Sequence, residues 1–143
     1  MNPEITSPLE EQARQLEPIY RSAGETRIGR LLDRYEMPFF YQQPTLIYDQ
    51  GKYEIWQPAF TLPAANGGVI DYFGRIDAYQ EQAMRHKENI YRDNGVHALV
   101  VTPPDLEGDQ WAERLYARIE EVARYAGANR PGYSQRSVDA YHH

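Results

Sequence analysis

A lysine interrupts a helix face that is otherwise suited to burial. Lys87 lies in a predicted helix over residues 77–92, on the face expected to cover a sheet. The other members of that face are apolar or aromatic, and they are Tyr79, Ala83, Ile90 and Tyr91. A lysine ammonium is seldom buried without a partner. Either its stem lies along the core with the charge at the edge, or the amine is functional and faces a carboxylate.

Asp71 is the matching anomaly on a strand. It is the one acid in a predicted strand over residues 69–73, whose other positions are apolar or aromatic. The strand leads into the helix of Lys87, so the two side chains could meet at the carboxyl edge of the sheet, where open α/β folds place their sites. A structural ion pair and a catalytic pair both fit this pattern, because buried charges need partners in either case.

Glu25 is a third candidate acid. Ser22 and Glu25 have the spacing of a capping box, which by itself would explain an acid in the first turn of a helix over residues 22–35. The same helix carries Arg27, Arg30 and Arg34 on one face, an arrangement typical either of a solvated surface or of a surface that contacts phosphates.

The elements that must position these residues follow an α/β pattern. Helices are expected over residues 9–20, 22–35, 77–92 and 109–125, and strands over 39–41, 45–48, 53–56, 60–62, 69–73 and 97–102. The expected fold class is α/β, with a mixed sheet of about four strands flanked by helices in the order α-α-β-β-β-α-β-α. Gly51 predicts a hairpin turn, and the helix between the last two strands predicts a right-handed βαβ crossover with parallel strands.

Residues 1–127 are expected to form a single domain, followed by a polar tail over residues 128–143. His142 and His143 are typical of an expression tag and could belong to one. Order in the tail would indicate contact with a second subunit or a neighbouring molecule.

Composition excludes several classes of protein. The chain has 143 residues, of which 41% are hydrophobic and none is cysteine, so disulfides and thiolate chemistry are absent. The absence of a long apolar run and of a leader-like N-terminus predicts a soluble cytoplasmic protein without membrane contact. The net charge of -6, from 15 Lys and Arg against 21 Asp and Glu, argues against a protein that holds nucleic acid by bulk charge.

Five segments in order resemble a known family. They are Gly24-Glu25-x-x-Ile28-x-x-Leu31-Leu32, Met37-Pro-Phe-Phe-Tyr41, Trp56-Gln-Pro58-Ala59-Phe60-x-Leu62-Pro63, Val69-Ile-Asp71-Tyr-Phe-Gly74 and Tyr79-x7-Lys87-x3-Tyr91. The set, covering about residues 20–102, resembles the PD-(D/E)xK nuclease superfamily, and within it the small nuclease-like domain of helicase IV-type proteins. The resemblance implies a restriction-endonuclease-like core.

The resemblance also implies a role for each candidate residue. Glu25 matches the family's helix acid near the metal, Asp71 matches the strand acid, and Lys87 matches the catalytic lysine. Ala59 stands where the family has its metal-binding aspartate, so the metal set Asp71, Glu25 and position 59 lacks one carboxylate. The implied activity is hydrolysis of DNA phosphodiester bonds, DNA being favoured over RNA, with Mg²⁺ or Mn²⁺ as cofactor.

Two explanations of Ala59 follow. The chain is either a natural, catalytically inactive module that binds nucleic acid or a partner protein, or a nuclease inactivated by an Asp→Ala change. We favour the second, because a decaying site would be expected to lose its costly buried charges, whereas Asp71 and Lys87 are both retained.

Partners follow from the same hypothesis. Six residues are expected to contact backbone phosphates: Arg27, Arg30, Arg34, Arg75, Arg85 and His86. Tyr72 or Trp56 could stack on a base of a single strand. A homodimer or a larger protein complex is compatible with the sequence. The acidic net charge then predicts modest non-specific affinity that falls strongly as salt rises.

Overall fold

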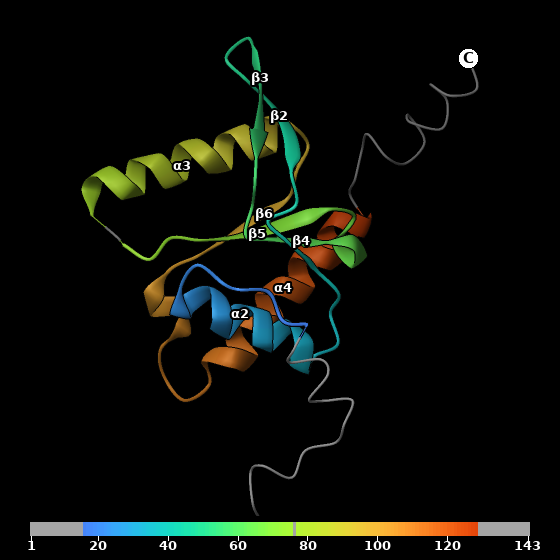
Figure 1. The fold of residues 1–143 in the computed structure, drawn as a ribbon, viewed down its shortest axis with the longest axis vertical. Helices are drawn as coiled ribbons and strands as arrows, with labels where there is room; N and C mark the ends of the chain where they lie inside the picture. Colours follow the sequence, from blue (N-terminus) through green and yellow to red (C-terminus); the bar gives the residue numbers. More distant parts are fainter. Residues whose placement is uncertain (1–15, 76, 129–143) are drawn as a thin grey trace, which may run out of the picture.

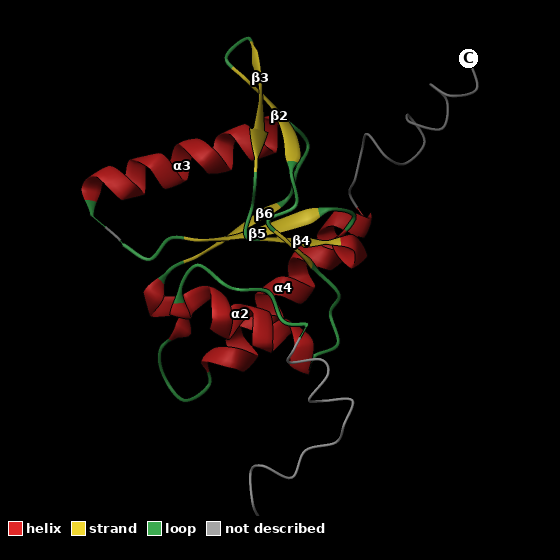
Figure 2. Cartoon of the chain, viewed as in Figure 1, coloured by secondary structure: helices red, strands yellow, loops and turns green. Residues whose placement is uncertain are grey.

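The computed structural model describes residues 16–75 and 77–128, which form an α/β fold (Figures 1 and 2). The helices are α2 (Ala23–Arg34), α3 (Ala78–Asp93) and α4 (Trp111–Ala128), with short 3-10 helices at Pro63–Ala65 and Pro103–Leu106. The strands are β1 (Phe40–Tyr41), β2 (Thr45–Asp49), β3 (Lys52–Trp56), β4 (Phe60–Leu62), β5 (Gly68–Tyr72) and β6 (Ala98–Val101). The predicted α/β class and the expected four-stranded mixed sheet are confirmed.

The helix expected over residues 9–20 is not confirmed. Residues 9–15 lie outside the described residues, and residues 16–20 are not helical. Pro18 gives the physical reason, because proline lacks the amide hydrogen that a helix interior needs and disfavours helical geometry at the preceding residue. The tail expected over residues 128–143 lies outside the described residues apart from Ala128, which ends α4.

One mixed sheet runs through the middle of the fold in the order β1-β4-β5-β6. β4 pairs with β5 in antiparallel fashion, whereas β5 and β6 are parallel and place Asp71 opposite Val100. Because α3 connects β5 to β6 and these strands are parallel, the predicted βαβ crossover with parallel strands is confirmed. The crossover packs one face of α3 against the end of β5. Asp71 and Lys87 need this arrangement if their side chains are to contact each other.

The strands β2 and β3 form a separate two-stranded hairpin that stands out from the sheet (Figure 1). Gln50 and Gly51 in its turn have φ of 51° and 83°. Two consecutive positive φ values are typical of the type I′ turn that suits the twist of paired strands, so the predicted hairpin and the role of Gly51 are confirmed.

The two faces of the sheet are covered differently. α2 and α4 lie against one face, and α3 with the hairpin lies on the other (Figure 1). Side chains alternate along β5, so Ile70 packs with the cluster under α2 and α4, whereas Val69 packs with Ile90 and Tyr91 of α3. Asp71 is two residues after Val69 and therefore also faces α3. In the described part of the chain, no helix is long and apolar enough to span a membrane.

Candidate functional site

A cleft of about 300 Å³ lies where the end of β5 meets the start of α2 and the middle of α3. It is lined by Arg21, Ser22, Glu25, Asp71, Tyr72, Phe73, Gly74 and Lys87. Three of the four predicted site residues, Glu25, Asp71 and Lys87, therefore line one cleft although they come from three elements. The fourth, Ala59, lies behind Asp71 and contacts it through its backbone.

Asp71 is the centre of this arrangement, with only 4% of its surface exposed. Its Oδ1 accepts a hydrogen bond of 3.0 Å from the backbone N–H of Ala59. Its Oδ2 accepts one of 2.8 Å from the hydroxyl of Tyr91 and lies 3.5 Å from Nζ of Lys87. Both carboxylate oxygens are thus engaged, which offsets the cost of removing the charge from water.

Lys87 pairs with Asp71 at the rim of the core. Its side chain is 37% exposed, and Nζ lies 5.6 Å from the ring centroids of both Trp56 and Phe73. The partly exposed ammonium lies near two aromatic rings and reaches the carboxylate, so the expected pairing of Lys87 with an acid at the edge of the core is present.

The helix face expected around Lys87 is only partly correct. Ile90 and Tyr91 are buried against the sheet, but Tyr79 is 76% exposed. Tyr79 is the second residue of α3, and the start of this helix projects beyond the sheet that the middle and end of α3 cover (Figure 1).

Glu25 has hydrogen-bond partners beyond those of a capping box. Ser22 Oγ accepts a hydrogen bond of 3.1 Å from the backbone N–H of Glu25, which is one half of that motif. The carboxylate of Glu25, only 3% exposed, instead accepts from the backbone N–H of Arg21 at 3.2 Å, from the Arg21 guanidinium at 3.0 Å, and from the Tyr41 hydroxyl. Burial and the hydrogen bond to Glu25 raise the pKa of Tyr41, so this phenol remains a donor at neutral pH.

Close packing fixes where the Glu25 helix starts. A Cβ atom at Gly24 would lie 2.2 Å from Cζ of Tyr72, so only glycine lets the start of α2 approach the ring at the end of β5. This contact sets Glu25 beside the strand that carries Asp71.

Ala59 is fully buried immediately before β4. Because its amide donates to Asp71, a longer side chain at this position would start beside the aspartate. Among the described residues, no three His, Asp or Glu side chains gather closely enough to hold a metal ion. The present cleft offers two carboxylates, and both already have donors.

The six residues expected to contact phosphates do not line the cleft. Arg27 lies 4.3 Å from the ring centroid of Trp111. Four others have acidic neighbours, in the pairs Arg30–Glu17 (3.2 Å), Arg75–Asp77 (3.7 Å), Arg85–Glu81 (3.0 Å) and His86–Asp49 (3.7 Å). Arg34 is in the last turn of α2. With a rise of about 1.5 Å per residue, it lies about 13 Å along the helix from Glu25.

The cation that does reach the cleft from the α2 side is Arg21, which the sequence interpretation missed. Arg21 is four residues before Glu25, and that spacing is a signal for an ion pair if the turn is compact. The partner Tyr41 gave no local signal, because its contact with Glu25 spans 16 residues of chain.

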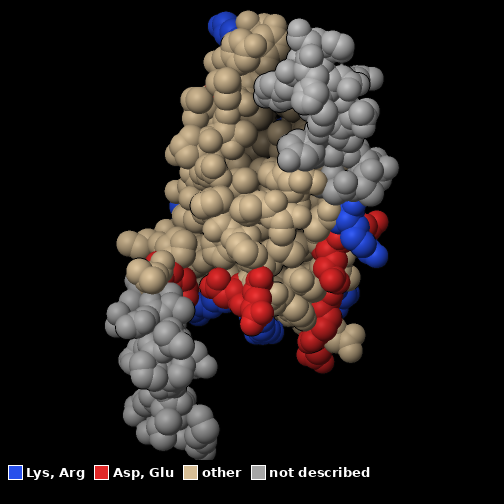
Figure 3. Space-filling model, turned by 90° about the vertical axis from the view of Figure 1, so that its right-hand side faces the viewer, with Lys and Arg blue, Asp and Glu red and all other residues tan. Residues whose placement is uncertain are grey.

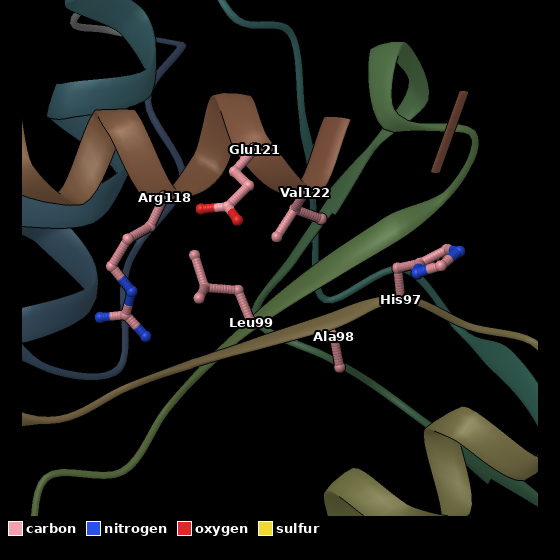
Figure 4. A pocket seen from close by; sticks show the side chains of 6 residues that line it. All are labelled: His97, Ala98, Leu99, Arg118, Glu121 and Val122. Atoms are coloured by element: carbon pink, nitrogen blue, oxygen red, sulfur yellow. The ribbon is translucent and has the colours of Figure 1, made fainter. Parts of the chain in front are cut away.

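A second hollow, of about 250 Å³, lies between β6 and α4 (Figure 4). Leu99 from the strand faces Arg118, Glu121 and Val122 of the helix, whereas Ala98 points to the opposite face of the sheet. The guanidinium of Arg118 is held by Asp105 at 3.0 Å. This hollow is separate from the buried carboxylates and presents no comparable group of acids with a lysine.

Replacing Tyr91 by phenylalanine is expected to lower the free energy of unfolding by about 2 kcal/mol at neutral pH, because a buried hydrogen bond to a charged acceptor is lost. Burial and the charge of Asp71 raise the pKa of the Tyr91 phenol from its ordinary value of 10.0. The contribution of the neutral phenol is complete below about pH 10 and is lost as the pH rises above the pKa of the unfolded chain.

The difference in stability between wild type and Tyr91→Phe should therefore shrink above about pH 10, by up to about 1.4 kcal/mol per pH unit. Urea unfolding of both proteins across this range measures it, and the shared contributions of Tyr20 and Tyr41 cancel in the difference. A difference that remains constant with pH contradicts the prediction.

Comparison with known proteins adds no relative. No protein-family model matches the chain, and no curated protein sequence matches it significantly.

Proposed function

We propose that this chain is a restriction-endonuclease-like domain of a metal-dependent nuclease that acts on DNA, in a form that lacks one metal-binding carboxylate at Ala59. One observation carries the proposal: Glu25, Asp71 and Lys87 line the same cleft, and Ala59 is hydrogen-bonded to Asp71. The family resemblance implies two buried acids, a lysine and a third acid. The cleft has the first two acids and the lysine, and Ala59 stands at the position of the third acid. A set of unrelated ion pairs would not be expected to converge in this way.

Charge explains why position 59 matters. The cleft contains two cations, Arg21 and Lys87, against two anions, Glu25 and Asp71, so it carries no net charge to attract a phosphodiester. A divalent cation would supply the missing positive charge, and it would need hard oxygen ligands.

The residues present do not fit a firmly held metal. Asp71 already accepts from Ala59 and Tyr91 and pairs with Lys87, and Glu25 is engaged by Arg21 and Tyr41. We therefore assign no metal-dependent step to the present chain. The proposed hydrolysis belongs to a form with aspartate at position 59, in which Lys87 would orient the attacking water or stabilise charge on the phosphate.

The test is cleavage by an Ala59→Asp variant in the presence of Mg²⁺ or Mn²⁺. We expect cleavage of DNA by the variant and none by the wild type under the same conditions. If the folded variant cleaves neither single-stranded, duplex or branched DNA nor RNA, the proposal is wrong.

The carboxylates of Glu25 and Asp71 already have hydrogen-bond donors and cationic partners. This favours a second candidate function, a catalytically inactive module that binds nucleic acid or a partner protein. This module would bind in a salt-dependent manner that is indifferent to Mg²⁺ and to substitution of Lys87. It differs from the first proposal in its response to Ala59→Asp, which would then confer no cleavage.

If nucleic acid occupies the cleft, Arg21→Ala is expected to reduce the slope of log affinity against log salt concentration by about 1, because one phosphate contact is lost. Arg27→Ala is the matched control, since Arg27 lies over Trp111 outside the cleft. Fluorescence anisotropy with a labelled oligonucleotide at several salt concentrations measures both. A reduced slope with Arg27→Ala alone would place binding on the arginine face of α2 instead.

A further inference from the structure

The outer face of the β2–β3 hairpin carries four large apolar or aromatic side chains that the fold leaves in solvent. Their exposed fractions are 61% for Leu46, 49% for Tyr48, 71% for Tyr53 and 62% for Ile55. The strand register places Leu46 opposite Ile55 and Tyr48 opposite Tyr53, so the four form a two-by-two array on one face. The rings of Tyr48 and Tyr53 touch, with centroids 5.0 Å apart. We call this array the hairpin patch.

Folding of the chain does not account for the patch. Alternate residues of a strand point to opposite faces, and the inner face of the hairpin already supplies Ile47, which is fully buried with Val69, Ile90 and Tyr91. Asn94 of the α3 cap fixes the hairpin at its edge by bonding both backbone groups of Tyr48, with distances of 2.9 Å. The outward side chains could be polar without loss to this packing.

The patch is large for a surface that meets only water. Aromatic side chains bury on the order of 150–250 Å² each, and taking the lower part of this range for Leu46 and Ile55, exposure of 49–71% leaves about 500 Å² in one place. Isolated soluble domains rarely expose more than a few hundred Å² of contiguous apolar surface, and larger areas mark interaction sites.

The chemistry of the patch favours a protein over a nucleic acid. None of its four members is charged, and two of them are aliphatic and have no ring to stack on a base. On the face of the molecule drawn in Figure 3, the hairpin at the top shows few charged side chains, whereas Asp and Glu gather lower, at the level of α2 and α4. The four side chains of the patch are uncharged and therefore present no like-charge repulsion to the same patch of a second copy.

We infer that the hairpin patch is the contact between two copies of this chain. The two patches face each other across a two-fold axis that lies in the plane of the contact and runs perpendicular to the strands. This axis places the Leu46 and Ile55 half of one copy against the Tyr48 and Tyr53 half of the other, with no charge buried. About 500 Å² from each copy gives about 1,000 Å² in total, the lower limit for a specific interface. An interface this small is typical of a weak, transient association.

Sedimentation equilibrium over a range of protein concentrations tests the inference. The wild type should pass from monomer to dimer as concentration rises, and Tyr53→Lys and Ile55→Lys should each remain monomeric throughout. Tyr79→Lys is the matched control, because Tyr79 is equally exposed but lies on α3 outside the patch. Since Tyr53 and Ile55 are largely in solvent, thermal unfolding should show that both variants fold as the wild type does.

The absence of cysteine from the chain permits a second, independent measurement. A mixture of the single variants Tyr53→Cys and Ile55→Cys, whose positions face each other in this dimer, should form a disulfide between copies under mild oxidation far faster than a mixture of Tyr53→Cys and Tyr79→Cys does. A wild type that is monomeric at every concentration overturns the inference, as does a dimer that Tyr53→Lys and Ile55→Lys leave intact. Neither result bears on the cleft, so failure here is distinguishable from failure of the proposed nuclease function.

Discussion

The Ala59→Asp variant is expected to cleave DNA at least about a thousandfold faster than the wild type when Mg²⁺ is present. Metal-assisted stabilisation of charge is worth several kcal/mol, and each 1.36 kcal/mol is a factor of ten in rate. Position 59 is where a third carboxylate has the greatest effect, because its backbone is already bonded to Asp71 and its side chain starts beside the buried acid. Cleavage of a labelled DNA, quenched over time with EDTA, measures the rate.

Two variants control for this gain of activity. Ala59→Asn has nearly the same shape as the aspartate but no charge, so it should remain inactive. Adding Lys87→Met to Ala59→Asp should remove most of the acquired activity, because the amine that faces Asp71 is then missing.

The stability of the Ala59→Asp variant provides a readout besides activity. Ala59 is fully buried, so an aspartate there places a second carboxylate close to Asp71 and should destabilise the metal-free protein. Mg²⁺ or Ca²⁺ should restore stability, since a ligand that binds only the folded state raises the free energy of unfolding. If the variant folds, is indifferent to both cations and does not cleave, the assignment of position 59 as a lost metal ligand is wrong.

Replacing Asp71 by alanine is expected to lower the free energy of unfolding by about 3 kcal/mol, because removing one member of a buried polar network leaves the other members unpaired. The Tyr91 hydroxyl and the Ala59 amide lose their acceptor inside the core. Lys87 loses less, because its partly exposed side chain can turn towards water. Denaturant unfolding at neutral pH measures the change.

Asp71→Asn is the matched control for this prediction. The amide keeps one oxygen acceptor but removes the charge, so the loss should be intermediate between those of wild type and Asp71→Ala. A double-mutant cycle with Lys87→Met isolates the ion pair. Unchanged stability of Asp71→Ala would show that the network contributes nothing to the fold and would leave a functional role as the remaining reason for a buried acid.

Much of the fold could be predicted because its signals are local. The stripe of Ile28, Leu31 and Leu32 has the period of a helix, and these residues are buried on one side of α2. Gly51 marked the hairpin because few other residues adopt its φ of 83°. The prediction failed over residues 16–20, where apolar spacing favoured a helix that Pro18 opposes.

The sequence by itself indicated that Asp71 and Lys87 lie within reach of each other. Strand alternation and the βαβ crossover, both short-range rules, put the acid on the face of the sheet that α3 covers. Only the tertiary structure decided which other side chains line the cleft beside Asp71 and Lys87. Glu25 reaches the cleft because Gly24 packs on Tyr72, while Arg27, Arg30 and Arg34 are carried away along the same helix. The position and rotation of α2 depend on contacts between residues far apart in the chain, and no local period in the sequence encodes them.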